Sequence, residues 1–94
     1  MITHVVMWKF KPNKEKEMHD FLDGLKALKG VIPQIRDLQV HVNCNPANDY
    51  DAMLWTQFDC MEDLQVYQTD PRHIAVAQIC KAARETRASL DFEE

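Results

Sequence analysis

The sequence predicts an α+β fold of the ferredoxin-like type, in which a four-stranded antiparallel sheet carries helices on one face. Stretches of alternating apolar residues, typical of strands, and stretches of apolar residues at helical spacing follow one another in the order β-α-β-β-α-β. In addition, the 94 residues contain no low-complexity tract and no linker-like change of composition. A single domain over residues 1–94 is therefore expected.

The first strand is expected over residues 2–10, where successive side chains alternate between the two faces of a sheet. Both faces are largely apolar. One of them carries His4, Val6, Trp8 and Phe10.

The first helix is expected from Lys14 to just before Gly30, because apolar residues recur there at helical spacing. Asn13 is its expected N-cap, since an Asn side chain can accept a hydrogen bond from the first turn of a helix.

Two further strands are expected over residues 38–44 and 52–58, which alternate in the same way and pair as a hairpin across the loop NPANDYD. Asp59 and Glu62 then resemble a capping box that opens a short helix. A longer helix starts at Pro71, and the segment SLDFE, residues 89–93, predicts a short closing strand.

The second face of this sheet should be covered by another copy of the chain. An antiparallel sheet with helices on one side often leaves its other side to water. Here that side would carry the apolar residues Val5, Met7, Met53 and Trp55. We therefore expect a homodimer in which two sheets face each other.

Charge and composition argue against several classes of partner. The net charge is −4, so a phosphate backbone or an anionic membrane would repel the chain on average. No segment approaches the roughly 20 apolar residues of a membrane span, and the N-terminus lacks an apolar signal core. We expect a cytoplasmic protein that binds neither nucleic acid nor membrane.

Cysteine usage favours neither disulfides nor a metal site. Cys44, Cys60 and Cys80 are odd in number and lie far apart, without a C-x-x-C pair. Buried reduced thiols are expected, with no bound metal.

The stretch YQTDPRH, residues 67–73, carries the most informative residues. Asp70 and Pro71 predict a helix start that places His73 at the third helical position. The positive helix end and partial burial would both lower the pKa of His73 and keep it neutral, as a general base requires. Tyr67 would point to the same interior, where its hydroxyl could donate to a developing oxyanion.

His4 is a polar ring on an otherwise apolar strand face, so three polar tips can converge on one apolar cavity between helices and sheet. Each residue also has a structural interpretation. His4 could be a core histidine bonded to backbone, Tyr67 a core aromatic with its hydroxyl at the rim, and His73 a helix-end residue. Composition and spacing do not decide between these interpretations.

Together, the segments ITHVVMWKFK, VIPQIRDLQV, DAMLWTQFD, YQTDPRH and the terminal DFE resemble the stress-responsive A/B barrel (Dabb) family across nearly the whole chain. The resemblance implies a dimeric α+β barrel. One plant member of the family is a polyketide cyclase that works without a metal, so no cofactor is expected.

By position, this resemblance implies catalytic roles for His4, Tyr67 and His73. It also implies that Asp91 could orient a histidine and contribute to ligand binding. Trp8 and Phe10, on the strand face of His4, are the other expected ligand-binding residues.

Asp70 departs from the family pattern, which usually reads Y-x-x-H-P-x-H at this break. Asp is the better N-cap, but a carboxylate near the mouth of the pocket would disfavour anionic ligands.

Three functions stay open at this stage. The first is a dimeric barrel that binds a small apolar or aromatic carbonyl-type ligand. The second is a cyclase-like or isomerase-like enzyme that uses His and Tyr for acid–base catalysis. The third is a structural or stress-protective dimer without a ligand.

Overall fold

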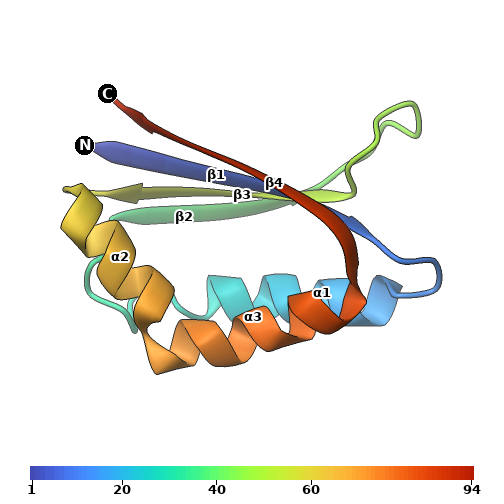
Figure 1. The fold of residues 1–94 in the computed structure, drawn as a ribbon, viewed down its shortest axis with the longest axis horizontal. Coiled ribbons are helices and arrows are strands. Elements are labelled where there is room, and N and C mark those ends of the chain that lie inside the picture. The colour runs from blue at the N-terminus through green and yellow to red at the C-terminus, as the bar shows by residue number, and fades with distance from the viewer.

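The computed structural model describes residues 1–94 and contains a four-stranded antiparallel sheet with three helices (Figure 1). Its elements are β1 (Ile2–Phe10), α1 (Glu15–Lys26), β2 (Asp37–Val42), β3 (Ala52–Phe58), α2 (Met61–Thr69), α3 (Pro71–Ala83) and β4 (Arg84–Glu93). The strands lie in the order β2-β3-β1-β4. This order confirms the predicted ferredoxin-like fold.

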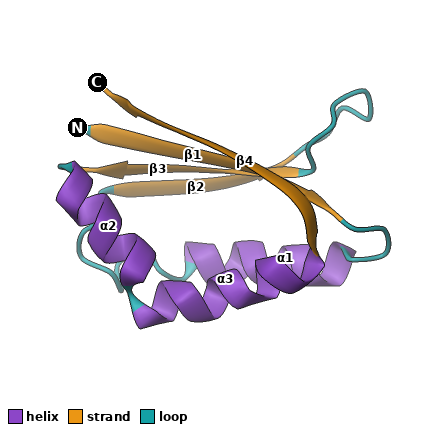
Figure 2. Cartoon of the chain, viewed as in Figure 1, coloured by secondary structure: helices purple, strands orange, loops and turns teal.

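The helices all lie on the same side of the sheet (Figure 2). Strand β3 alternates between buried and half-buried residues along its whole length, and β1 buries the side that carries Val6 and Trp8. These buried side chains pack against those of α1, such as Phe21 and Leu25. The core therefore fills the layer between sheet and helices, as the alternation predicts.

Helices α1 and α3 pack closely at Gly24. A Cβ atom built on Gly24 would lie 3.0 Å from Cγ1 of Val76 on α3. Glycine in a helix interior usually destabilises the helix, but here its missing side chain allows the two helices to approach. This contact brings α3 against α1.

Two predicted helix caps are wrong. Asn13 adopts φ 63° in the turn before α1, and Lys14 occupies the cap position without a side-chain bond. An asparagine tolerates this left-handed conformation better than most residues, which explains its place in the turn. Asp59 does not cap α2, because its carboxylate binds the guanidinium of Arg36 through two contacts of 2.9 Å.

Strand β4 is longer than the predicted segment 89–93. It begins directly after α3 and pairs with β1 along its whole length, with a register shift at Lys9 and Phe10.

Strand β2 ends at Val42, so Cys44 lies in the following loop and is exposed, contrary to the prediction of three buried thiols. No helix is long and apolar enough to cross a membrane.

Candidate functional site

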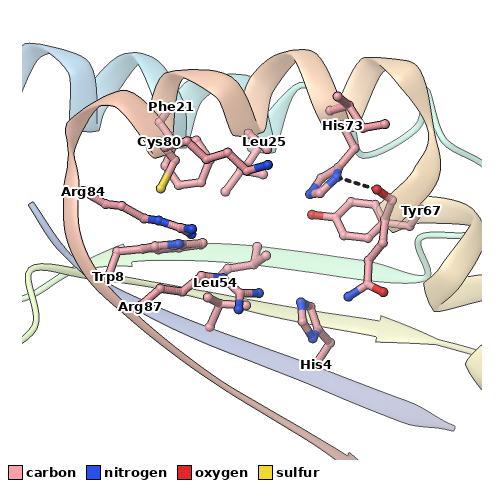
Figure 3. Close-up of a pocket in the computed structure, with 15 residues that line it drawn as sticks. His4, Trp8, Phe21, Leu25, Leu54, Tyr67, His73, Cys80, Arg84 and Arg87 are labelled. Carbon is pink, nitrogen blue, oxygen red and sulfur yellow. Dashed lines mark hydrogen bonds between the residues drawn. The ribbon is translucent and has the colours of Figure 1, made fainter.

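A cavity of about 300 Å³ lies between the sheet and the helices. Its walls are mainly apolar and include Trp8, Phe21, Leu25 and Leu54 (Figure 3). Strands β1, β3 and β4 form one side, and α1, α3 and the end of α2 form the other. A concave, largely apolar site with a few polar groups is the usual form of a small-molecule site.

Tyr67, on the last turns of α2, has a fully buried side chain whose hydroxyl lacks a hydrogen-bond partner in the protein. In Figure 3 its hydroxyl points into the cavity. Burial raises the pKa of Tyr67 above its usual value, while the charge of Arg87 acts weakly in the opposite direction. The phenol therefore stays protonated at neutral pH and is available as a hydrogen-bond donor.

His73 lies next to Tyr67, with ring centroids 4.3 Å apart. Its Nδ1 is 3.2 Å from the carbonyl oxygen of Gln68. A carbonyl can only accept a hydrogen bond, so Nδ1 carries the hydrogen and Nε2 keeps its lone pair. Burial is the main cause that lowers the pKa of His73, and the hydrogen bond with the carbonyl of Gln68 opposes it. The charge of Arg87 also lowers this pKa, whereas the charge of Asp70 raises it. His73 is thus a neutral base at pH 7.

His4 enters the cavity from β1, opposite Asp91 on β4. Its ring is almost completely buried, and Nδ1 lies 2.5 Å from Oδ1 of Asp91. Because a carboxylate accepts the hydrogen bond, Nδ1 of His4 is its donor and Nε2 remains free. Asp91 does not line the cavity, so its contact with the site is through His4.

The two aromatic residues predicted to bind the ligand, Trp8 and Phe10, differ in their position relative to the cavity. Trp8 lines the cavity and packs edge-on against Phe21, with ring centroids 4.8 Å apart. Phe10 is buried two residues further along β1 but does not line the cavity. Its ring centroid lies 6.3 Å from that of Phe21, which places Phe10 in the core behind the cavity wall.

Sequence reasoning missed three cationic residues of the cavity, Lys81, Arg84 and Arg87. The predicted closing strand began too late to include the two arginines. Had it begun at residue 84, alternation would have placed Arg87 on the same face as Asp91. Arg84 reaches the face of β4 that carries Arg87 only because of the register shift at Lys9 and Phe10, and no sequence pattern indicates that shift.

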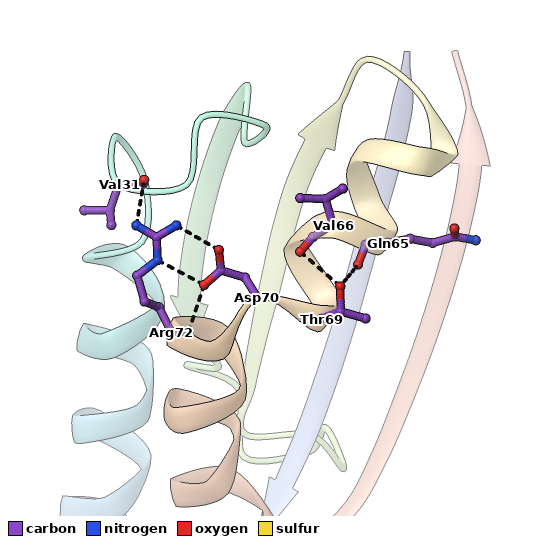
Figure 4. Close-up of polar contacts among 6 residues, drawn as sticks. All are labelled: Val31, Gln65, Val66, Thr69, Asp70 and Arg72. Carbon is purple, nitrogen blue, oxygen red and sulfur yellow. Dashed lines mark hydrogen bonds and ion pairs between the residues drawn. The ribbon is translucent and has the colours of Figure 1, made fainter.

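Asp70 does not line the cavity, although its charge reaches the cavity residue His73 and raises the pKa of that imidazole. It caps α3, as predicted, by accepting a hydrogen bond of 2.8 Å from the backbone N–H of Arg72. The guanidinium of Arg72 binds the same carboxylate and also reaches the carbonyl of Val31 (Figure 4). These contacts hold the pKa of Asp70 at about 2.

The cavity therefore combines a protonated phenol, a neutral imidazole and a carboxylate-bound histidine around an apolar space. Such a set can bind a carbonyl oxygen and exchange a proton with a neighbouring atom. No group of three or more His, Cys, Asp or Glu side chains is arranged to hold a metal ion.

The solved structures that resemble the chain over nearly its full length include three proteins of different kinds. A dimeric ferredoxin-like protein of unknown function from Bacteroides fragilis is 31% identical, with a TM-score of 0.93 and coverage of 99% of this chain and 95% of that one. A hydroxynitrile lyase from Passiflora edulis is 15% identical, with a TM-score of 0.84 and coverage of 97% and 90%. An antibiotic biosynthesis monooxygenase is 7% identical, with a TM-score of 0.83 and coverage of 100% and 98%.

The two enzymes catalyse different reactions on one fold, so they show the fold alone and assign no activity. No curated protein matches the sequence significantly. The family comparison, in contrast, matches residues 2–94 to the stress responsive A/B barrel domain, Dabb. With its β-α-β-β-α-β order and an identity of 31% to a dimeric ferredoxin-like protein, the chain belongs to the Dabb family.

Proposed function

We propose that the protein is a homodimer that binds a small apolar or aromatic carbonyl compound in the cavity between helices and sheet. The observation that carries this proposal is the buried hydroxyl of Tyr67, which points into the cavity and has no protein partner. An unpaired buried donor costs free energy. A ligand carbonyl oxygen would accept its hydrogen bond, while the apolar walls around Trp8 and Leu54 would hold the rest of the ligand.

The homodimer is proposed because the second face of the sheet carries apolar side chains that no element of the chain covers. Leu90 and Phe92 of β4 and Met7 of β1 are exposed on this face, in addition to the half-buried Trp55 of β3. The B. fragilis relative is dimeric, which supports the same arrangement here. The cytoplasmic location expected from the sequence stays a prediction.

Binding is tested with a matched pair of probes that differ only in the carbonyl group. Acetophenone and ethylbenzene are titrated into ¹⁵N-labelled protein, and the amide shifts of cavity residues are followed. We expect tighter binding of acetophenone, and an acetophenone affinity that falls in Tyr67→Phe to that of ethylbenzene. Equal binding of both probes by the wild type would contradict the role of Tyr67, and no shift with either would remove the proposed ligand class.

A second candidate function, acid–base catalysis, is favoured by the free lone pair on Nε2 of His73. Nε2 would take a proton from the carbon next to the carbonyl, and the C–H electron pair would form the C=C bond of an enolate. Tyr67 would donate its hydrogen bond to the oxygen, which gains the negative charge. Asp91 would keep His4 oriented beside this centre.

Catalysis is tested by deuterium exchange at the methyl group of acetophenone in D₂O, followed by NMR. A positioned general base contributes about 10²- to 10⁴-fold to a rate, so we expect a loss of that size in His73→Ala. His19→Ala is the matched control, because His19 is an exposed histidine on α1, away from the cavity. Equal exchange by wild type and His73→Ala would leave binding as the only proposed function.

A further inference from the structure

The arginines of the protein fall into two groups. Arg36 and Arg72 each bind an aspartate through two nitrogens, with distances of 2.8–3.0 Å. Arg84 and Arg87 form no ion pair, and neither does Lys81. None of the three cationic residues that line the cavity therefore has a carboxylate partner.

The acidic residues nearby do not neutralise these cations. Asp91 shares a face of β4 with Arg87 but is held by His4. Glu85 follows Arg84 and lines a different hollow, beside Lys11. The single side-chain bond of Arg87 is a long one, 3.4 Å from Nη1 to Oγ of Ser89. A guanidinium has five donors, so Arg87 retains most of its hydrogen-bonding capacity.

In Figure 3 the Arg84 side chain extends into the cavity from the end opposite Tyr67 and His73, and the Arg87 side chain extends from β4 toward the middle of the cavity, on the side of His4. Arg84 is half-buried, and Arg87 is exposed. The charge of Arg87 opposes the rise that burial causes in the pKa of Tyr67 and of Cys80, and it adds to the lowering of the pKa of His73, which is consistent with a guanidinium at the cavity. The cavity therefore carries the hydrogen-bonding groups Tyr67 and His73 at one end, and two guanidinium groups without an ion pair, one at the opposite end and one near the middle.

We propose that the ligand is a small organic anion, whose carboxylate or phosphate group is bound by Arg84 and Arg87 while its carbonyl end reaches Tyr67 and His73. Both anionic groups match the fork of a guanidinium. The inference rests on the proposed ligand-binding function and specifies its ligand class. The sequence suggested that the carboxylate of Asp70 would disfavour anionic ligands. In the structure this carboxylate is not part of the cavity lining and is bound by Arg72.

The test compares three probes that share an acetylphenyl body: 4-acetylbenzoate, 4-acetylphenyl phosphate and the uncharged 4-acetylbenzamide. Each is titrated into ¹⁵N-labelled wild-type protein and into Arg84→Gln, Arg87→Gln and Arg36→Gln. Arg36→Gln is the control, since it removes the same charge from an exposed site that is bound to Asp59. Thermal melting shows that each variant is folded.

We expect at least one anion to bind more tightly than the amide. Hydrogen bonds to charged groups contribute about 1.5–3 kcal/mol, so each cavity variant should weaken anion binding about 10- to 100-fold. Amide affinity should not change, and Arg36→Gln should behave as the wild type. The relative affinities of carboxylate and phosphate identify the preferred anionic group.

Equal affinity for anions and amide, with shifts at cavity residues, would overturn this inference and leave carbonyl binding intact. The same conclusion follows if an anion preference survives in both cavity variants. If none of the probes shifts a cavity residue, both this inference and the proposed ligand class are overturned.

Discussion

The hydroxyl of Tyr67 is fully buried and unpaired in the protein, so its cost to folding can be measured directly. Replacing Tyr67 by Phe removes the polar group and keeps the ring that packs against Phe58. We expect the free energy of unfolding to stay the same or to rise by about 1–3 kcal/mol, as measured by urea unfolding. Tyr50→Phe, at a half-buried loop position, is the control. A loss of stability in Tyr67→Phe would mean that the hydroxyl is already satisfied.

His73 should make stability depend on pH. Its pKa in the folded protein lies below 6.5, mainly because of burial. The unfolded chain therefore binds its proton first as pH falls, and stability decreases as pH drops through about 6.5 towards the lower folded pKa. We expect His73→Gln to flatten the fall in urea midpoint between pH 7.5 and 5.5. His19→Gln should keep the wild-type slope, and an unchanged slope in His73→Gln would contradict the lowered pKa.

Local signals in the sequence set the positions of His73 and His4 in the fold. The pair Asp70 and Pro71 starts α3 and so sets the position of His73. Strand alternation similarly placed His4 on the inward face of β1. Arg84 and Arg87 could not be placed in this way, since their inward position depends on where β4 starts and on its register shift.

At the scale of elements, α3 depends on its cap. The side chain of Asp70 accepts the hydrogen bond from the N–H of Arg72, and Pro71 precedes it at the first helical position. We expect Asp70→Ala to reduce hydrogen-exchange protection in the first turn of α3 and to disturb His73, whereas Asp70→Asn should retain most of the protection because Asn is an equally good cap. Equal protection in all three proteins would show that α3 is held by packing alone.

Low pH should weaken the same cap, as the Asp70→Ala substitution does, because it protonates the carboxylate of Asp70. The pKa of Asp70 is about 2, below its ordinary value of 3.8, because of Arg72. Its contribution to stability is therefore complete above about pH 4 and is lost as pH falls towards 2.

The failed cap predictions show the limit of local patterns. Asp59 has the right spacing to Glu62 for a capping box, yet Arg36, which is distant in sequence, binds its carboxylate. Asn13 suits both a cap and a left-handed turn, and the turn is the one formed. In each case the residue type allowed two roles, and the path of the chain decided between them.

At the scale of the whole molecule, the uncovered sheet face should hold the dimer together. Leu90 is 65% exposed in the single chain, and Trp55 lies on the same face. We expect light scattering to give a dimer for the wild type and a monomer for Leu90→Glu or Trp55→Glu, because a charge buried between two apolar sheets is costly. Ile79→Glu is the control, since Ile79 is an exposed apolar residue of α3 on the helical side. A wild-type monomer at micromolar concentration would remove the proposed dimer.

The central claim is that a carbonyl ligand occupies the cavity against Tyr67. The chain has only two tyrosines, so protein labelled with ¹³C at the tyrosine ζ carbon gives two signals. Tyr67 faces the cavity, and Tyr50 lies outside it in the loop after β2. The account predicts that acetophenone shifts the Tyr67 signal and leaves the Tyr50 signal in place, while ethylbenzene shifts Tyr67 less. An unchanged Tyr67 signal at saturating acetophenone would contradict it.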